Sequence, residues 1–148
     1  MKEKSPNDLR LVDIYKAPES FEALFRLLKS RDPRANISHR KMPSWNEHVR
    51  FVRSKPHKAW YLIKTQDGVA GGIYLSKNDE IGLFIFKHYQ GKGYGKKALT
   101  ELMKKHTKVR KFLANISPLN ARSRRFFEGL GFRHIQNTYE LLTKREPK

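Results

Sequence analysis

The chain has 148 residues, of which 38% are hydrophobic and 31% charged, and its formal net charge is +18. A chain of this length can bury roughly 70% of its unfolded surface, which is enough for one hydrophobic core and too little for two. It contains no cysteine, so disulfides, thiolate zinc sites and cysteine nucleophiles are excluded.

The N-terminal segment MKEKSPNDLR lacks the apolar stretch of a secretion signal. No run in the sequence approaches the ~18 apolar residues of a membrane span. We therefore expect a cytoplasmic protein with no membrane partner, folded as a single domain over residues 1–148.

The first third of the chain predicts one strand and two helices. Leu9–Tyr15 has the alternation of a strand, and Glu19–Leu28 has apolar residues at helical spacing. Residues 29–43 are polar and rich in Ser, Arg, Pro and His, which is typical of a loop. Ser44 followed by Glu47 forms a capping box, which predicts a helix from there to about Arg53.

The rest of the chain alternates strands and helices. A hairpin is predicted from Ala59–Thr65 and Val69–Ser76, joined by residues 66–68. The remaining predicted elements are a strand over 80–86, a helix over 94–106, a strand over 109–115, a helix over 120–129 and a last strand from Phe132 to about Leu142. This order predicts an α/β fold, with a mixed sheet and helices on both faces.

The turn after the strand at 80–86 is the most distinctive stretch of the sequence. A strand-like run from Ile81 to Lys87 is followed by Gln90, the next five residues are Gly-Lys-Gly-Tyr-Gly, and a basic helical segment comes after them. Glycine allows a backbone with positive φ and leaves no side chain in the way, so several main-chain N–H groups can face one anion. The helix that follows adds its unpaired N–H groups and the positive end of its dipole. The turn therefore indicates a polyphosphate site.

Three common phosphate or nucleic-acid motifs do not fit this turn. A Walker loop needs a glycine five residues after Gly91, and a dinucleotide fingerprint needs one three residues after Gly93, but both positions are Lys96. An RNA-recognition signature needs aromatic and β-branched residues where Lys96 and Lys97 stand.

Two motifs resemble those of the GCN5-related N-acetyltransferase (GNAT) family. Gln90, Gly93 and Gly95 match the family's motif A, which has Gln or Arg, two residues, Gly, one residue, then Gly or Ala. The stretch that starts at Asn120 and ends at Phe132, NARSRRFFEGLGF, is similar to motif B. The likeness extends over about residues 58 to 142 and implies a GNAT-like, mostly antiparallel sheet whose central strand pair is splayed.

The resemblance implies acetyl-CoA as cofactor and assigns it a set of residues. Main-chain groups of the splayed strand would pair with the pantetheine arm, the turn would hold the diphosphate, and motif B would supply further contacts. The implied cofactor-binding residues are Leu83, Phe84, Ile85, Gln90, Gly91, Lys92, Gly93, Tyr94, Gly95, Lys96, Asn120 and Phe127. We expect no metal site.

The chemistry requires a base, because an alkylamine whose conjugate acid has a pKa of about 10.4 is almost fully protonated at neutral pH, and the protonated form cannot attack a thioester. Family members often place Glu or His on the splayed strand or a nearby loop. Glu80 and Asp79 stand at the start of that strand, and strand alternation lets only one of them face the site. His39 and His48 are rival bases.

Motif B departs from the family pattern at the residue that would donate a proton to the departing thiolate. Many members carry Tyr seven residues after the motif B Asn, where this chain has Phe127, which has no hydroxyl. Tyr94, Tyr139, Ser123 or a water would have to replace it, or the thiolate leaves without assistance. Asn115 stands where some protein-modifying relatives carry a base carboxylate.

We therefore expect an acetyl-CoA-dependent N-acetyltransferase that joins the acetyl group to a primary amine by direct attack in a ternary complex. The high Arg and Lys content of residues 37–61 suits an anionic small-molecule acceptor such as an amino sugar nucleotide. A protein N-terminus or lysine is an alternative acceptor, and a nucleic-acid-binding or catalytically silent module of the same fold is an alternative function. We do not expect nucleic acid as a partner, and a homodimer stays open.

Overall fold

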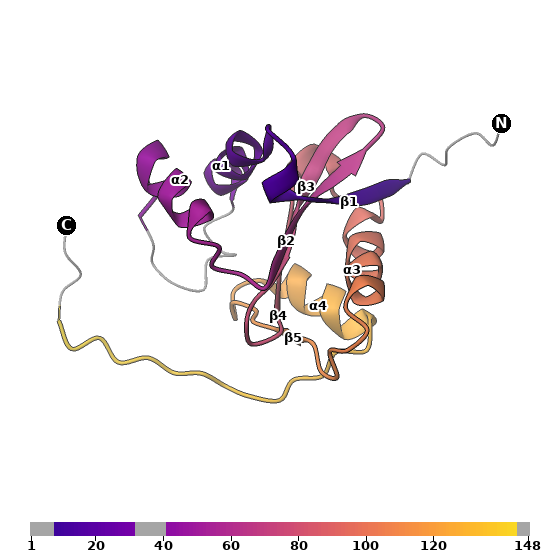
Figure 1. Ribbon diagram of the computed structural model, residues 1–148. Coiled ribbons are helices and arrows are strands. Elements are labelled where there is room, and N and C mark those ends of the chain that lie inside the picture. The colour runs from indigo at the N-terminus through magenta and orange to yellow at the C-terminus, as the bar shows by residue number, and fades with distance from the viewer. Residues whose placement is uncertain (1–7, 32–40, 145–148) are drawn as a thin grey trace.

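The computed structural model describes residues 8–31 and 41–144, and in it a five-stranded sheet lies between two layers of helices (Figure 1). The strands lie side by side in chain order and are β1 (Leu9–Asp13), β2 (Ala59–Thr65), β3 (Gly68–Leu75), β4 (Glu80–Ile85) and β5 (Leu113–Ala114). Strands β1 to β4 pair antiparallel, whereas β5 runs parallel to β4. The predicted mixed, mostly antiparallel sheet is confirmed.

Helices cover both faces of the sheet, as the sequence predicts. In Figure 1, α1 (Ser20–Ser30) and α2 (Trp45–Arg53) lie to the left of the sheet, and α3 (Tyr94–Lys105) and α4 (Ala121–Gly129) lie to its right. The capping box at the start of α2 is present, with Ser44 and Glu47 bonding each other's main-chain N–H groups. The described residues also contain two short 3-10 helices, η1 (Ile14–Lys16) and η3 (Lys87–Tyr89).

Strand alternation divides the core into two halves. Ile63 and Ile73 point to the α3 and α4 side, where they pack with Leu99 and Leu102. Leu62, the neighbour of Ile63 along β2, points to the α1 and α2 side and packs with Leu24. Successive side chains of a strand face opposite ways, so one apolar strand supplies both halves.

The first strand ends earlier than predicted because of a single side chain. Asp13 accepts a hydrogen bond from the main-chain N–H of Tyr15 at 2.9 Å, which caps η1 and turns the chain out of the sheet. The strand predicted over Leu9–Tyr15 is therefore confirmed only as far as Asp13.

Strands β4 and β5 pair only at one end. Their register joins Glu80 to Leu113 and Ile81 to Ala114, and no further pair follows among the residues that the structure describes. From Gly82 onward, β4 therefore has β3 on one side and no strand on the other. This is the splayed central pair that the sequence comparison predicted.

Two strands predicted towards the C-terminal end differ in the structure: the first is shorter than predicted, and the second does not form in the described residues. The strand predicted over 109–115 is reduced to Leu113–Ala114, because β5 diverges from β4 after Ala114 and has nothing further to pair with. The last strand predicted from Phe132 to about Leu142 does not form. Residues 133–144 lie exposed, and in the described chain no neighbouring strand is hydrogen-bonded to them.

None of the helices in the described ranges is both long enough and apolar enough to cross a bilayer.

Candidate functional site

The glycine-rich turn between η3 and α3 has an open, left-handed backbone. Gly91 and Gly93 have φ angles of +77° and +84°, which residues with a side chain rarely adopt. A β-carbon built at either position would meet no other atom within 4 Å, so the main chain is accessible there. Lys92, between them, is exposed to solvent.

Helix α3 begins directly at this turn. Gly93 is its N-cap, and no side chain caps the helix there. The first-turn N–H groups and the positive end of the helix dipole therefore face the turn without competition from a capping side chain. Lys92 and Lys96 add two exposed cations, so the turn has the donors and the charge to hold a diphosphate.

Gln90 ties the turn to both sides of the site. Its side-chain amide donates to the main-chain carbonyl of Ile85 at 3.0 Å, and the Arg122 guanidinium donates to its side-chain oxygen at 2.6 Å. Arg122 lies in α4, so this chain of contacts joins the end of β4 to motif B. Arg122 is not among the site residues predicted from the sequence, although its position two residues after Asn120 in motif B could have identified it.

The unpaired edge of β4 presents main-chain groups from alternate residues. At the two ends of the β3–β4 ladder, the Ser76 N–H donates to Glu80 and the Phe86 N–H donates to Ala70. With no register shift between these ends, the groups of the even-numbered residues face β3 and those of Leu83 and Ile85 face the unpaired edge. Of the three predicted pairing residues, Phe84 therefore directs its main-chain groups to β3.

Glu80 lies at the point where β4 and β5 separate. The side-chain amide of Asn115 donates to one of its carboxylate oxygens, and the Ser76 hydroxyl lies 3.4 Å from the other. Its side chain shares a face of β4 with Gly82 and Phe84, and Phe84 packs on the α1 and α2 side. Asn115 thus holds the carboxylate that the sequence placed among the candidate bases.

Asp79 is adjacent to Glu80 in sequence but points elsewhere. Its backbone is left-handed, with φ of +63°, and its carboxylate forms an ion pair with Lys58. Asp79 also lines a surface depression together with residues 108–111, outside the β4 edge. The structure therefore separates the two carboxylates that the sequence could not distinguish.

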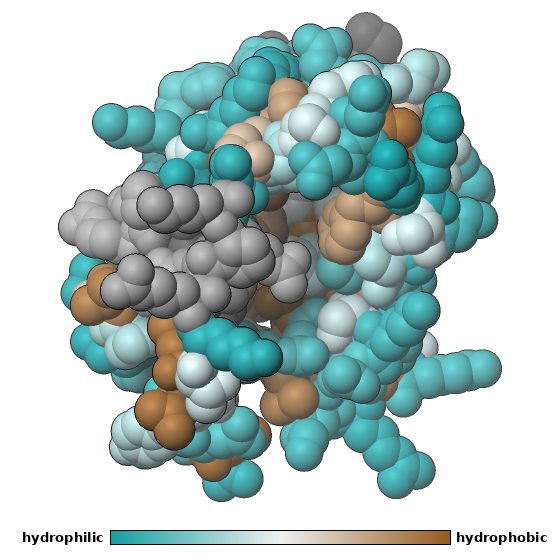
Figure 2. Space-filling model, turned by 90° about the vertical axis from the view of Figure 1, so that its left-hand side faces the viewer, coloured by the Kyte–Doolittle hydropathy of each residue, from teal (hydrophilic) through white to brown (hydrophobic). Residues whose placement is uncertain are grey.

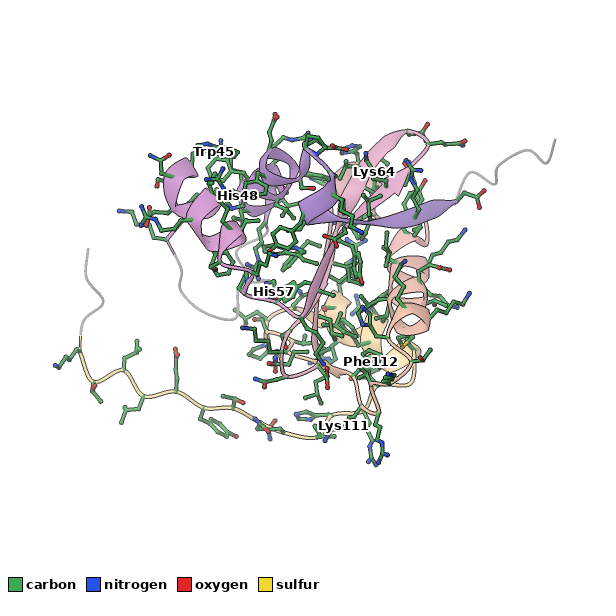
Figure 3. The ribbon with its side chains drawn as sticks, viewed as in Figure 1. Trp45, His48, His57, Lys64, Lys111 and Phe112 are labelled. Atoms are coloured by element: carbon green, nitrogen blue, oxygen red, sulfur yellow. The ribbon has the colours of Figure 1, made fainter. Side chains whose placement is uncertain are left out.

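A row of aromatic rings covers the α1 and α2 side of β2 and β3. His57 stacks on Tyr74 with ring centroids 3.7 Å apart, and Trp60 lies edge-on to both. Tyr74 in turn stacks near Phe84 at 6.3 Å, and its ring lies over Gly82, where a β-carbon would come within 1.8 Å of it. Figure 3 labels His57, which lies beside the sheet near the end of α2.

Burial in this aromatic row lowers the pKa of His57 from 6.5 to about 4. Its imidazole is therefore neutral near pH 7. The Arg31 guanidinium lies 4.7 Å from the centre of the Phe84 ring and brings a positive charge to the same side. Figure 2 shows this side of the molecule, which is hollowed near its centre, with apolar side chains inside the hollow.

Other predicted residues have structural roles in the described chain. His48 is 2% exposed and its Nε2 lies 2.8 Å from the Phe21 carbonyl, so this rival base is a packing residue of α2. Phe127 is 7% exposed and packs edge-on against Phe126 and Phe132 in the core. Asn120 caps α4 by accepting from the Ser123 N–H at 3.0 Å.

The two predicted tyrosines have different surroundings, and one of the rival histidines is not among the described residues. Tyr139 is 89% exposed in the C-terminal segment. Tyr94 is 4% exposed and packs with Tyr89 in the core. His39 lies outside the described residues.

The sequence matches the family model described as the Acetyltransferase (GNAT) family over residues 21–132. No curated protein matches it.

Solved structures show the same fold at low sequence identity. An acetyltransferase from Thermus thermophilus is 21% identical, with a TM-score of 0.72 over 87% of this chain and 89% of that one. The enzyme AAC(6')-Iy, bound to the bisubstrate analogue CoA-S-monomethyl-acetylneamine, is 16% identical, with a TM-score of 0.66 over 93% and 98% of the two chains. A putative acetyltransferase from Salmonella typhimurium, solved with acetyl-CoA, is 19% identical, with a TM-score of 0.61 over 84% and 78%.

Proposed function

This chain belongs to the GNAT acetyltransferase family, whose acetyl donor is acetyl-CoA, and from that premise we propose that it acetylates a primary amine by direct attack within a ternary complex. One N-acetyltransferase domain accounts for the fold of the described residues. The observation that carries the proposal is the splayed edge of β4, which runs from a held carboxylate at Glu80 to the open turn at Gly91 and Gly93.

The residues present fit acetyl-CoA. The turn and the start of α3 offer main-chain donors to the diphosphate, and Lys92, Lys96 and Arg122 offer cations beside it. Leu83 offers its main-chain groups and Ile85 its N–H to the amide-containing arm, as one strand does to another, while the Ile85 carbonyl accepts from Gln90. When bound, acetyl-CoA supplies the activated thioester.

Glu80 is the base in this proposal. Glu80 lies in the short stretch of β4 that pairs with β5, two residues before the unpaired edge begins, and Asn115 fixes the orientation of its carboxylate. It accepts a proton from the ammonium group of the acceptor, directly or through one water, so that the neutral amine can attack. The Leu83 N–H, which faces the same edge, donates to the carbonyl oxygen as negative charge develops there.

No side chain at position 127 can protonate the thiolate, because Phe127 is a core ring without a hydroxyl. A thiol has a pKa of about 8.5, so its thiolate is a tolerable leaving group, and a water can protonate the thiolate after it departs. General acid catalysis contributes about 10² to 10⁴ in rate, so an enzyme that lacks an acid side chain is slowed and still active.

The acceptor side supports an anionic amine that carries a flat group. Tyr74, Trp60 and Phe84 form an aromatic row on the face of the sheet to which Glu80 points, and aromatic side chains favour planar partners. Arg31 supplies a cation next to those rings. An amino sugar nucleotide has the amine, the phosphates and the base that this arrangement suits. A protein N-terminus or lysine is the alternative acceptor.

The proposal is tested by measuring thiol release from acetyl-CoA over a panel of amines that includes amino sugar nucleotides, simple amino sugars and peptides. We expect turnover with at least one primary amine. In Glu80→Gln, kcat should fall by about 10² to 10⁴, because the amine keeps its proton, while the affinity for acetyl-CoA stays unchanged.

Asp79→Asn is the matched control, since it removes the neighbouring carboxylate, which pairs with Lys58 outside the β4 edge. Its kcat should stay close to that of the wild type. Equal losses in the two variants would contradict the assignment of the base. Absence of turnover with every amine, together with saturable acetyl-CoA binding, would indicate a catalytically silent member of the family.

A further inference from the structure

A second cationic feature lies at the paired end of β4, away from the glycine-rich turn. It is a surface depression of about 430 Å³ beside the point where β4 and β5 are hydrogen-bonded. Its lining comes from three separate parts of the chain and consists of Lys58, Asn78, Asp79, Lys108, Val109, Arg110, Lys111 and Leu113. Figure 3 labels Lys111, which lies at the lower end of the molecule in that view, together with its neighbour Phe112.

The charge of this depression is strongly positive. Four of the eight lining residues are Lys or Arg, and the single carboxylate among them, Asp79, is paired with Lys58. Lys104 and Lys105, exposed in the last turn of α3, carry the positive charge beyond the rim. A concave surface lined by charges of one sign concentrates counter-ions.

The electrostatics of a neighbouring side chain agree with this picture. Burial lowers the pKa of His106, and the charges of Lys58 and Lys105 lower it further. After burial, the two lysine charges therefore act on the His106 pKa in the direction expected beside a positive surface, and the Asp79 carboxylate acts in the opposite direction.

The lining distinguishes between classes of anionic partner. Protein interfaces are usually anchored by buried aromatic and aliphatic side chains, whereas nucleic-acid interfaces are more polar and far more positive. The depression has Val109 and Leu113 as its apolar side chains and no aromatic ring in its lining. Single-stranded nucleic acid needs rings on which its bases can stack, so this lining suits the phosphates of a duplex.

We propose that this depression, defined by Lys58, Lys108, Arg110 and Lys111, is a second anion site that binds the phosphate backbone of a nucleic-acid duplex without reading its sequence. The cations come from two separate parts of the chain, Lys58 and residues 108–111, and can meet phosphates of the duplex backbone. A nucleic-acid partner is not expected from the sequence. The site is separate from the acetyl-CoA turn and does not rest on the proposed reaction.

The test is fluorescence anisotropy of the full chain with a short labelled RNA duplex of arbitrary sequence, at a series of salt concentrations. For the wild type, the logarithm of the binding constant should fall linearly with the logarithm of the salt concentration, by about 0.9 per phosphate contact. The triple variant Lys108→Glu, Arg110→Glu, Lys111→Glu should bind at least about tenfold more weakly and lose about 3 units of that slope.

Lys16→Glu, Lys41→Glu, Arg50→Glu is the matched control, because these exposed residues lie on η1, before α2 and on α2, and the change in net charge is the same. It should keep nearly all of the wild-type affinity and slope. Equal losses in both triple variants would show that only net charge attracts the duplex and would overturn the site. Unchanged binding in the first variant would also overturn it.

Two further readouts separate this proposal from others. Displacement of the duplex by polyglutamate at the same charge concentration as effectively as by unlabelled duplex would assign the depression to an acidic protein and overturn the proposal. Stabilisation by acetyl-CoA, measured by thermal unfolding, should be equal in the two triple variants, which have the same net charge. This stabilisation depends on the glycine-rich turn, so its loss in the first variant would show a damaged fold and not a lost duplex contact.

Discussion

His57 shows how packing sets the chemistry of a single residue. Its ring lies flat on Tyr74 and edge-on to Trp60, and this burial lowers its pKa to about 4. An unfolded chain would bind the proton near pH 6.5, so the unfolded state takes up protons before the folded state does. The contribution of neutral His57 to the stability of the fold is therefore fully present above about pH 6.5 and is lost as the pH falls from there towards 4.

We predict that His57→Phe weakens this acid sensitivity. Phe can occupy the same stacked position and has no proton to take up. Each unit of pKa difference corresponds to about 1.4 kcal/mol, so the free energy of unfolding of the variant should fall less than that of the wild type between about pH 7 and about pH 5. Urea unfolding at the two pH values measures this difference. Parallel losses in the two proteins would show that His57 is not the group responsible.

Two adjacent carboxylates illustrate the same point for the candidate base. Asp79 has a left-handed backbone and turns to Lys58, and Glu80 begins β4 and turns to Asn115. The sequence shows two acidic residues in a row, and alternation states only that they face opposite ways. The location of Asn115 decides that Glu80 is the one held near the point where β4 and β5 separate.

At the scale of elements, the turn from Gln90 to Gly95 and helix α3 work as one unit. The left-handed glycines bring the chain round so that the uncapped helix start faces the same side as the exposed edge of β4. Gln90 fastens the turn to Ile85, and Arg122 fastens it to α4. The site therefore joins β4 and the start of α3, which are neighbours in sequence, to α4, which lies further along the chain.

We predict that Gly93→Glu abolishes acetyl-CoA binding. The new carboxylate would lie among the main-chain donors and repel the diphosphate. Isothermal titration calorimetry with acetyl-CoA should give no measurable heat at concentrations that saturate the wild type. The far-ultraviolet circular dichroism should keep its wild-type shape.

Gly131→Glu is the control for backbone strain. Gly131 also has a left-handed backbone, with φ of +95°, and open space where a β-carbon would stand, but it follows α4 instead of preceding α3. Acetyl-CoA should bind this variant with nearly wild-type affinity. Loss of binding in both variants would mean that strain, and not charge at the turn, prevents it.

At the scale of the whole molecule, the net charge of +18 acts on every anionic ligand. Such a field raises the rate of encounter with anions by about 10 to 10³ at low salt, and salt screens it with a Debye length of about 10 Å at 0.1 M. The turn before α3 and the depression beside β5 lie near different ends of β4, so two anions need not compete.

We predict that the association rate of acetyl-CoA falls at least about tenfold between low and high salt. Stopped-flow fluorescence gives this rate, and S-acetylpantetheine, which lacks the phosphates, is the control, because its association rate should barely change. A salt-independent rate for acetyl-CoA would show that the net charge does not steer it.

Much of the element order could be predicted from local patterns. The capping box at Ser44, the hairpin of β2 and β3 and the glycine-rich start of α3 depend on residues close together in sequence, and all three are confirmed. The exceptions are strands, because a strand exists only where a partner offers hydrogen bonds. Residues 132–142 alternate like a strand, yet no neighbour pairs with them, and β5 is short because β4 diverges from it.

The sequence by itself determined the turn, the helix that follows it and the family motifs, since these need only backbone freedom, helix propensity and spacing. Only the tertiary structure decided that Glu80 and not Asp79 is held by Asn115, that Arg122 reaches Gln90, and that Lys58 shares one depression with the three cations of residues 108–111. The physical reason is that side chains meet across the sheet through strand register and helix packing, which link residues that no local pattern connects.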